Sequence, residues 1–304
     1  MRIIVTGGCG FIGSHITDYL IENGHDVAVV DNLSTGNIAN LNPGARFYRA
    51  DILSEELKNI FVDFKPEAVY HEAAQIDVQK SIKDPGFDAT TNVVGTVKVL
   101  ENCRDANVRK IVYASSAAVY GDPKYLPVDE KHDIAPMSYY GISKFSPELY
   151  IKAFCEMFGF KYTILRYANV YGIRQDPKGE GGVVSIFTDK LLRGETPVIY
   201  GNGEQTRDFI YVKDIAAANL AALAVGDNMV INVSTGIKTS VNTLLEIMSE
   251  GRVKAEYKPA RKGDILHSYL DNAKMKTILK YDIKYPLKLG IKETMDYYAQ
   301  KLKK

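Results

Sequence analysis

The stretch MRIIVTGGCGFIGSHITDYLIENGHDVAVVD, residues 1–31, decides the fold. An apolar run at residues 3–5 precedes a glycine-rich turn and a helix-patterned segment, and a second apolar run at residues 27–30 ends on Asp31. This order of strand, turn, helix, strand and acid is that of the first unit of a doubly wound parallel sheet. The stretch therefore predicts a dinucleotide-binding α/β fold.

The glycine-rich turn has the spacing that a bound pyrophosphate requires. Gly8, Gly10 and Gly13 match the pattern G-x-G-x-x-G. Gly7, Gly10 and Gly13 also match G-x-x-G-x-x-G. Glycine lets the backbone approach the pyrophosphate, and the N–H groups of the following helix bind its charge. The flanking strands favour this interpretation over a tight structural turn in another kind of α/β protein.

Asp31 indicates which dinucleotide binds. It ends the second expected strand, 18 residues past Gly13. A carboxylate at this place accepts hydrogen bonds from the adenosine ribose and repels a 2′-phosphate. We therefore expect NAD rather than NADP.

The composition limits the partners. The 304 residues are 46% hydrophobic, so a substantial core is expected, and the net charge of +1 gives no electrostatic footprint for nucleic acid. Three widely spaced cysteines indicate a reducing compartment, not a disulfide framework or a metal site. The chain opens directly with its first strand, and its longest near-apolar stretch, residues 216–225, is too short to span a bilayer. We expect a cytoplasmic protein without a metal, a membrane or a nucleic-acid partner.

The strand-like runs continue at regular intervals. They alternate with helical segments at residues 46–49, 67–71, 110–114 and 162–165. This alternation predicts a doubly wound parallel sheet. We expect an NAD-binding domain over residues 1–168, with a returning segment near 208–235, and a smaller, interleaved substrate domain over 169–304.

Residues just past the third and fourth strands are placed to line a cofactor, because open α/β sheets bind ligands at the carboxyl ends of their strands. Asp51 and Ile52 follow the third strand, where the adenine would lie, although Asp51 could instead cap a helix from Ser54. Ala73 and Ala74, which follow the fourth strand, are small enough to allow close approach of a ligand.

Asn92 stands inside a helix expected over residues 88–107. A polar side chain there is either a cofactor-side hydrogen-bonding group or part of an interface. The sequence leaves both interpretations open.

Three polar residues after the fifth strand suit proton chemistry. Tyr140 and Lys144 are four residues apart, so on a helix they share one face. A phenol titrates near pH ~10, but a lysine and an oxidised nicotinamide would lower that pKa. The phenolate could then act as a general base on a hydroxyl that Ser116 also hydrogen-bonds. The alternative is a tyrosine–lysine pair on a solvated face, which the dinucleotide fingerprint disfavours.

Four motifs carry a specific resemblance to a known family. They are residues 6–14 (TGGCGFIGS), 31–36 (DNLSTG), 115–121 (SSAAVYG) and 140–144 (YGISK). In them the chain resembles the extended short-chain dehydrogenase/reductases, and within these most of all the UDP-glucose 4-epimerases and their close relatives. The resemblance runs the length of the chain.

The resemblance implies an NAD site assembled mainly from the first domain. Its members would be Gly7, Gly10, Phe11, Ile12, Gly13, Asp31, Asn32, Ser34, Gly36, Asp51, Ile52, Ala73, Ala74, Gln75, Asn92, Ala114, Tyr140, Lys144, Tyr167 and Val170.

The resemblance also implies a UDP-sugar site. Its members would be Ser116, Tyr140, Asn169, Val183, Val184, Val198, Tyr200, Arg207, Arg261, Asp264 and Ser268. In similar proteins the two arginines bind the diphosphate, as a guanidinium fork matches phosphate oxygens, and the aromatic residue lies against the uracil. The acid contacts the uridine ribose there.

The sequence leaves open the roles of three of these substrate residues. Without the resemblance, Arg207 would be taken for a surface ion pair with Asp208, and Asn169 for a turn residue. Ser268 stands four residues past Asp264. Family members with a tyrosine at that position favour plain hexoses, and smaller residues tend to admit N-acetyl sugars. A serine leaves room for either.

Two local predictions concern the second half of the chain. The pair Asn202-Gly203 lies between apolar runs and predicts a hairpin turn. Asp214 is expected to cap a helix over residues 212–225.

The resemblance implies a UDP-sugar 4-epimerase that retains NAD. Tyr140 would take the proton of the sugar 4-hydroxyl, Lys144 would hold the nicotinamide ribose, and Ser116 would steady the 4-oxygen, so that a transient 4-keto sugar forms. Similar enzymes form homodimers through the helices that correspond here to residues 88–107 and 146–158.

Other functions remain open to different degrees. A 4,6-dehydratase is disfavoured, because residues 115–118 contain no carboxylate. A UDP-glucuronate 4-epimerase, another UDP-uronate enzyme or a simple dehydrogenase stays possible. A catalytically idle dinucleotide-binding sensor is disfavoured by the intact set of Ser116, Tyr140 and Lys144.

Overall fold

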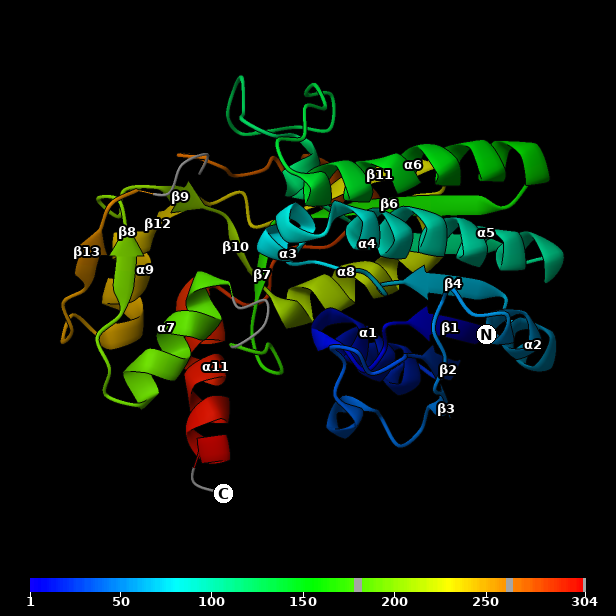
Figure 1. The fold of residues 1–304 in the computed structure, drawn as a ribbon, viewed down its shortest axis with the longest axis horizontal. Helices are drawn as coiled ribbons and strands as arrows, with labels where there is room; N and C mark the ends of the chain where they lie inside the picture. The colour runs from blue at the N-terminus through cyan, green and yellow to red at the C-terminus, as the bar shows by residue number, and fades with distance from the viewer. Residues whose placement is uncertain (178–181, 261–264, 303–304) are drawn as a thin grey trace.

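The computed structural model describes residues 1–177, 182–260 and 265–302. A seven-stranded parallel sheet dominates it (Figure 1). In spatial order its strands are β11 (Met229–Val233), β6 (Lys161–Tyr167), β5 (Lys110–Ser116), β4 (Ala68–His71), β1 (Arg2–Thr6), β2 (Asp26–Val30) and β3 (Arg46–Tyr48). The chain winds outward from β1 in both directions, so the predicted doubly wound α/β fold is confirmed.

The strands of this sheet are buried on both faces because helices cover each side. In β1 and β2 every residue after the first is buried, which explains the unbroken apolar runs of the sequence. One face is covered by α1 (Phe11–Glu22), α8 (Val212–Ala224) and α10 (Ala273–Ile278). The other face is covered by α2 (Glu56–Phe64), α5 (Gly95–Asp105) and α6 (Tyr139–Phe158).

Short helices connect the strands to these layers. After β4 the chain forms α3 (Val78–Lys83), α4 (Pro85–Ala89) and a π-helical segment, Thr90–Val94, that runs into α5. Two 3₁₀ turns, Ile38–Asn40 and Ala117–Val119, follow β2 and β5. The second turn lies directly after Ser116, at the edge where the strands end.

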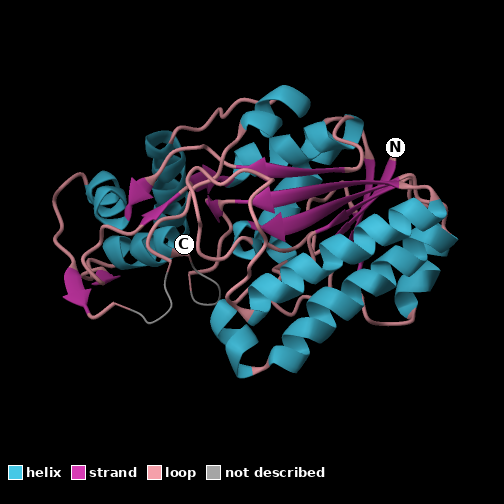
Figure 2. Cartoon of the chain, turned by 90° about the horizontal axis from the view of Figure 1, so that it is seen from above, coloured by secondary structure: helices cyan, strands magenta, loops and turns pink. Residues whose placement is uncertain are grey.

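A smaller part of the chain lies beyond the carboxyl ends of the large sheet, toward which the strand arrows of Figure 2 point. Its helices are α7 (Val183–Leu192), α9 (Val241–Ser249) and α11 (Leu287–Leu302). Its strands pair as β7 (Asn169–Tyr171) with β10 (Phe209–Tyr211), β8 (Val198–Tyr200) with β13 (Glu256–Lys258), and β9 (Thr206–Arg207) with β12 (Thr239–Ser240). A separate apolar cluster of buried residues, which includes Phe187, Leu244 and Ile291, holds these elements together.

The chain crosses between the two parts more than once. After β10 it returns through α8 to the large sheet, where β11 pairs in parallel with β6. Asp208, directly before β10, anchors this crossing. Its carboxylate accepts hydrogen bonds from Thr235 N and Gly236 N, both at 2.9 Å.

Two local predictions are wrong. The pair Asn202-Gly203 does form a turn, but the strands on either side of it do not pair with each other. Strand β8 pairs in parallel with β13, and β9 pairs with β12. Asp214 lies in the first turn of α8 but caps nothing there, because its carboxylate accepts hydrogen bonds from Tyr281 Oη at 2.6 Å and Lys284 N at 2.8 Å.

A buried ion pair lies under the carboxyl ends of β5 and β6. Glu148 of α6 is 0% exposed and Arg166 of β6 is 3% exposed. The Glu148 carboxylate accepts from Arg166 Nε at 2.9 Å and Nη2 at 2.6 Å, and from Ser115 Oγ at 2.6 Å. Arg166 also donates to Tyr120 Oη at 3.0 Å. Because each charge has several partners, the pair ties α6 to the strand ends.

We predict that Glu148→Leu lowers the free energy of unfolding by about 3–5 kcal/mol, since it leaves the Arg166 charge buried without its carboxylate. Urea denaturation followed by circular dichroism measures the change. Glu156→Leu is the matched control, because Glu156 is exposed on the same helix, and it should change stability by about 0.5 kcal/mol or less. Equal effects of the two substitutions would show that the ion pair does not hold this region.

Candidate active site

The glycine turn between β1 and α1 is shaped by close backbone contacts. Gly7 has a φ of +70°, and a Cβ added to it would lie 2.7 Å from Ala73 N. A Cβ on Gly13 would lie 2.3 Å from the Gly7 carbonyl oxygen. Gly8 differs, because the three atoms nearest to a Cβ there belong to the side chains of Val29 and Thr17. Close backbone contacts therefore require glycine at the positions of the longer pattern, G-x-x-G-x-x-G.

The start of α1 presents N–H groups to this turn. Gly10 is the N-cap residue, and its own N–H donates to the Gly7 carbonyl oxygen at 3.0 Å. The first-turn amides of Phe11, Ile12 and Gly13 cannot be satisfied inside the helix. They can bind an anion, such as the pyrophosphate of a dinucleotide.

Asp31 is held rigidly at the end of β2. Its carboxylate accepts from Cys9 N at 2.9 Å and from Leu33 N at 2.8 Å, and the residue is only 7% exposed. A Cβ on Gly36 would lie 2.7 Å from Asp31 Oδ1, so glycine is required for the loop to pass there. The structure brings Asp31 beside the glycine turn, as an adenosine ribose ligand requires.

The residues predicted for the adenine end lie near Asp31. Asn32 Nδ2 donates to Asp51 Oδ2 at 2.7 Å, and Asn32 Oδ1 accepts from Ser34 N at 2.9 Å. Asp51 Oδ1 accepts from Leu53 N at 2.8 Å, which fixes the loop after β3. Ile52 is buried at 6% exposure, and its side chain packs against Gly95 of α5.

The Asn92 side chain is buried and makes its hydrogen bonds inside the chain. It is 2% exposed and lies in the π-helical segment, a kind of distortion that recurs at functional sites. Its side chain accepts from Gln75 N at 2.7 Å and donates to Gln75 O at 2.8 Å and Ser143 Oγ at 2.9 Å. Its burial inside the single chain shows that it does not lie on the chain's exposed surface. The amide fixes the loop after β4 against α6.

The first turn of α6 packs directly on the segment that follows Ser116. Ser138 caps the helix by accepting from Gly141 N at 3.0 Å. A Cβ on Gly141 would lie 2.8 Å from the Ala118 carbonyl oxygen. Ser116 ends β5, and its hydroxyl accepts from Ala118 N at 3.2 Å. This contact places Tyr140, the residue before Gly141, at the strand end that carries Ser116.

Lys144 lies one turn along α6 from Tyr140 and is buried. Its Nζ lies 5.0 Å from the ring centroid of Tyr113 in β5, and the residue is 4% exposed. Burial lowers the pKa of Lys144 to about 8, against the opposing charges of Glu72, Asp88 and Glu148.

Glu72 is a site residue that the sequence analysis did not single out. It follows β4 directly, and its Oε1 accepts from Tyr167 Oη at 3.1 Å. Burial raises the pKa of Glu72 to about 7, while Lys144 and the Tyr167 hydrogen bond act against that rise. One signal could have found it, because an acid at the carboxyl end of a buried parallel strand stands where such sheets bind ligands.

The predicted substrate residues come from several segments of the smaller part. Arg207 of β9 donates to Thr206 O at 2.8 Å and to Leu266 O at 3.4 Å. Ser268 N donates to the same Thr206 carbonyl oxygen at 3.1 Å, so Arg207 and Ser268 are held beside one another. Tyr200 ends β8 at 36% exposure. Arg261 and Asp264 lie outside the described residues.

The other predicted substrate residues differ in exposure. Asn169 is exposed, and its N–H donates to Asp208 O at 2.9 Å. Val183 and Val198 are partly buried, whereas Val184 is 2% exposed and belongs to the core of the smaller part. Asp208 is 1% exposed, with its carboxylate bonded to Thr235 and Gly236.

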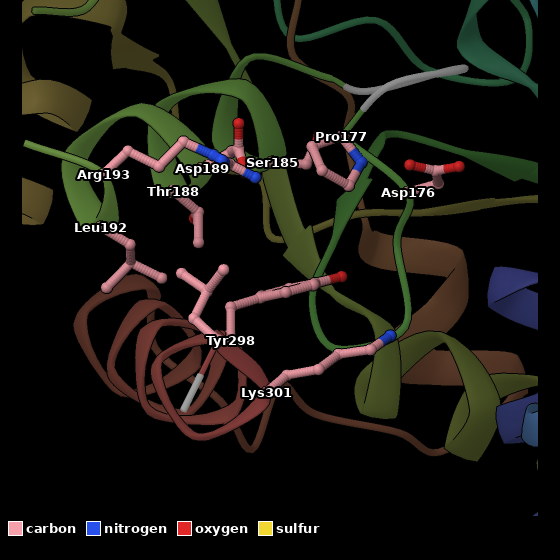
Figure 3. Close-up of a pocket in the computed structure, with 10 residues that line it drawn as sticks. Asp176, Pro177, Ser185, Thr188, Asp189, Leu192, Arg193, Tyr298 and Lys301 are labelled. Carbon is pink, nitrogen blue, oxygen red and sulfur yellow. The ribbon is translucent and has the colours of Figure 1, made fainter. Parts of the chain in front are cut away.

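A separate cavity of about 360 Å³ lies between α7 and α11 (Figure 3). Ser185, Thr188, Leu192, Tyr298 and Lys301 are among the residues that line it. It includes none of the predicted site residues. Within the described part of the chain, no cluster of His, Cys, Asp and Glu side chains could hold a metal ion. No helix there is long and apolar enough to cross a membrane.

Comparison with known proteins agrees with this geometry. Residues 3–234 match the sequence profile described as the NAD dependent epimerase/dehydratase family. The chain belongs to this family. A putative UDP-glucose 4-epimerase of Methanocaldococcus jannaschii is 50% identical over 300 residues, which are 97% of this chain and 97% of that protein. The resemblance drawn from the four motifs is thereby confirmed.

Solved structures extend the similarity to the whole fold. The UDP-glucose 4-epimerase of Thermotoga maritima, crystallised with UDP-glucose, has a TM-score of 0.96 and 47% identity, covering 99% of this chain and 100% of that one. The UDP-N-acetylglucosamine 4-epimerase of Methanobrevibacter ruminantium, in complex with UDP-N-acetylmuramic acid, has a TM-score of 0.94 and 37% identity. That alignment covers 99% of this chain and 98% of the other.

The residues present fit the family's NAD. The turn at Gly7 and Gly13 leaves no room for side chains, the first amides of α1 are positioned for an anion, and the Asp31 carboxylate is fixed at the ribose end. NAD would be held by these groups, and it would supply hydride chemistry.

We predict that Gly13→Ala weakens NAD binding at least about tenfold, or about 1.4 kcal/mol, because the new Cβ would force the Gly7 carbonyl oxygen out of the turn. Calorimetric titration of nucleotide-stripped protein with NAD measures the change. Gly86→Ala is the matched control, since the nearest atom to a Cβ there is Asp84 Oδ1 at 3.7 Å. Unchanged NAD affinity in folded Gly13→Ala protein would contradict the role of this turn.

Proposed function

We propose that this chain is an NAD-dependent UDP-hexose 4-epimerase that interconverts UDP-galactose and UDP-glucose. The observation that carries the proposal is the packing of Gly141 on the Ala118 carbonyl oxygen, because it fixes the first turn of α6, which carries Tyr140, against the segment that follows Ser116. Membership of the epimerase/dehydratase family supports it, as does the likeness to UDP-glucose 4-epimerases over the whole chain.

Tyr140 acts as the general base and acid on the sugar 4-hydroxyl. Its phenolate is stabilised by the ammonium group of Lys144, one helical turn away. Ser116 donates a hydrogen bond to the sugar 4-oxygen and orients it toward Tyr140. NAD, when bound, supplies the acceptor for hydride from C4 and its donor on return. Tyr140 then returns its proton to the 4-oxygen.

Arg207 anchors the diphosphate of the substrate. Its guanidinium donates to the carbonyl oxygens of Thr206 and Leu266, which orients the fork. Arg261 and Asp264 join it on the diphosphate and the uridine ribose, and Tyr200 lies against the uracil. An anchored diphosphate lets the 4-keto sugar turn over without leaving the site.

The choice of sugar depends on the space at Ser268. A serine there leaves room for an N-acetyl group, so we extend the proposal to the N-acetylhexosamine pair. The similarity to a UDP-N-acetylglucosamine 4-epimerase supports this extension.

We predict that the purified protein, without added NAD, converts UDP-galactose to UDP-glucose, and that Tyr140→Phe lowers the rate about 100-fold or more, because a general base contributes about that much. Chromatography or NMR resolves the products, and UDP-N-acetylgalactosamine in a parallel reaction tests the room at Ser268. Tyr139→Phe is the matched control, since Tyr139 is an exposed tyrosine on the same helix turn.

Other results would redirect the proposal. Conversion of UDP-glucuronate alone would make the chain a uronate epimerase. Turnover only with continuous supply of NAD would indicate a simple dehydrogenase. Binding of NAD with no conversion of any of these sugars would leave a dinucleotide sensor. Full activity in Tyr140→Phe would show that another group is the base.

We also propose that the chain forms a homodimer through α5 and α6, which lie side by side on the outer layer (Figure 1). Large apolar side chains stay exposed along this layer: Val94, Ile142, Leu149, Tyr150, Met157 and Phe158. Such a row of exposed apolar side chains fits the helix pair of a second copy. The domain boundary at residue 168 and a cytoplasmic location remain predictions from the sequence.

We predict that Leu149→Glu converts a dimer to a monomer, because the charge would be buried against the partner's helices. Leu149 is 53% exposed in the single chain, so the folded protomer should tolerate the substitution. Size-exclusion chromatography with light scattering measures the mass. Val62→Glu is the control, since Val62 is 63% exposed on α2. A monomeric parent protein, or a Leu149→Glu variant that stays dimeric, would contradict this interface.

A further inference from the structure

His71 ends β4 and lies at the centre of a buried chain of hydrogen bonds. Its Nδ1 is 2.7 Å from Thr6 Oγ1, at the end of β1, and its Nε2 is 2.9 Å from Thr96 Oγ1 of α5. All three residues are 1% exposed or less. The ring therefore joins the strand that precedes the glycine turn to a helix of the layer that also contains α6.

The partners of the two hydroxyl groups decide where the protons lie. Thr96 Oγ1 donates its one proton to the Asn92 carbonyl oxygen at 2.6 Å, so it accepts from His71 Nε2–H. Burial lowers the pKa of His71 to about 3, so the ring is neutral at pH 7 and its Nδ1 is an acceptor. Thr6 Oγ1 therefore donates to Nδ1, and it accepts in turn from the Ala73 N–H at 3.3 Å.

The Nδ1 side of this chain ends at the cofactor turn. Ala73 N lies directly against Gly7, because a Cβ added to Gly7 would be 2.7 Å from it. Thr6 supplies the hydrogen-bond acceptor for this N–H and so fixes the loop after β4 where it passes the turn. We therefore expect the contact between Thr6 and His71 to affect how tightly NAD binds.

The Nε2 side continues to the backbone of the proposed base. Asn92, whose carbonyl oxygen accepts from Thr96, donates with its side-chain amide to Ser143 Oγ at 2.9 Å. Ser143 Oγ then donates to the Tyr140 carbonyl oxygen at 3.1 Å. Thr96, Asn92 and Ser143 are each 2% exposed or less, so these contacts are shielded from water.

A second route leads from the same ring to Lys144. Tyr113 of β5 pairs with His71 in the sheet, and the two rings pack with their centroids 5.8 Å apart. Tyr113 Oη donates to the Lys144 carbonyl oxygen at 3.2 Å. His71 is thus connected to the backbone of both Tyr140 and Lys144.

We propose that His71 is a positioning residue of the active site, whose neutral ring, protonated on Nε2, connects the cofactor turn to the backbone of Tyr140 and keeps the base in register with bound NAD. This inference rests on the proposed function, in which Tyr140 acts on the sugar 4-hydroxyl. His71 acts through Thr6 and Thr96 and not on the sugar itself. Its two nitrogen atoms have separate tasks, since Nδ1 serves the cofactor side and Nε2 serves the base.

Two substitutions of His71 separate these tasks, because each keeps one of the two polar atoms. In His71→Asn the side-chain oxygen takes the place of Nδ1 and accepts from Thr6, but Thr96 loses its donor. In His71→Gln the longer amide donates to Thr96 in place of Nε2, but Thr6 loses its acceptor. Both variants lose the ring that packs on Tyr113, so the comparison between them isolates the hydrogen bonds.

We expect the two variants to differ in opposite order in two measurements. His71→Asn should have the lower kcat for UDP-galactose at saturating NAD, by about tenfold, because a small displacement of Tyr140 slows proton transfer. His71→Gln should bind NAD more weakly, by about fivefold, because the hydrogen bond that fixes Thr6 is lost. Calorimetric titration of nucleotide-stripped protein measures the Kd for NAD. Thr163→Val is the matched control, since it removes a buried hydroxyl elsewhere in the sheet, bonded to Gly226 O at 2.9 Å, and it should change neither quantity.

Equal kcat values in the two His71 variants, or the reverse order, overturn the inference, as do NAD affinities that are equal or fall in the same order as kcat. If either variant does not fold, Thr96→Val and Thr6→Val take their places, because valine keeps the shape of threonine and removes only its hydroxyl. Thr96→Val should then have the lower kcat and Thr6→Val the weaker NAD binding, and the same criterion applies.

The titration of the Tyr140 phenol distinguishes a failure of this inference from a failure of the proposed function. It is measured without sugar, as the phenolate absorbance of NAD-bound protein minus that of its Tyr140→Phe counterpart. We expect a higher midpoint in His71→Asn than in His71→Gln, because a displaced phenolate is farther from Lys144 and the oxidised nicotinamide. A parent protein that converts no UDP-sugar would refute the proposed function. The midpoints would then decide in place of kcat, and equal midpoints or the reverse order would overturn the role of His71.

Discussion

The arrangement of the site depends on backbone segments that approach each other more closely than side chains permit. A Cβ on Gly13 would lie 2.3 Å from the Gly7 carbonyl oxygen, and one on Gly7 would lie 2.7 Å from Ala73 N. These contacts fix the first turn of α1 against the ends of β1 and β4. A similar contact, between Gly141 and the Ala118 carbonyl oxygen, fixes α6 over the end of β5. Backbone packing therefore places the cofactor turn and the proposed base on the same edge of the sheet.

Buried polar contacts keep that edge rigid. Glu148 and Arg166 join α6 to β6, and Asn92 joins the loop after β4 to α6 through Gln75 and Ser143. Each of these buried groups has several hydrogen-bond partners. Removing one group would therefore leave buried donors or acceptors of its partners without a hydrogen bond. These contacts hold Tyr140 and Lys144 in place on a helix that is exposed along its outer side, as the proposed proton transfer requires.

The parts that could be predicted from the sequence are those that local patterns determine. Short strand-like runs, such as residues 3–5 and 27–30, predicted strands of the large sheet, and the glycine spacing with Asp31 predicted the cofactor end. Contacts between residues that lie far apart in the sequence were not predicted. Strand β8 pairs with β13 instead of closing a hairpin at Gly203, and Asp214 bonds to Tyr281 instead of capping α8. Glu72 was missed for the same reason, because its partner Tyr167 is 95 residues away.

The position of Glu72 has a physical cost that a neutral residue would avoid. Burying a lone carboxylate or a lone ammonium group is expensive, and each normally becomes neutral instead. Glu72 and Lys144 each favour the charged form of the other, which opposes the effect of lost hydration on both pKa values. The positive charge of an oxidised nicotinamide would favour the ionised Glu72 in the same way, and in the proposed mechanism it would also favour the Tyr140 phenolate, the form that accepts the proton.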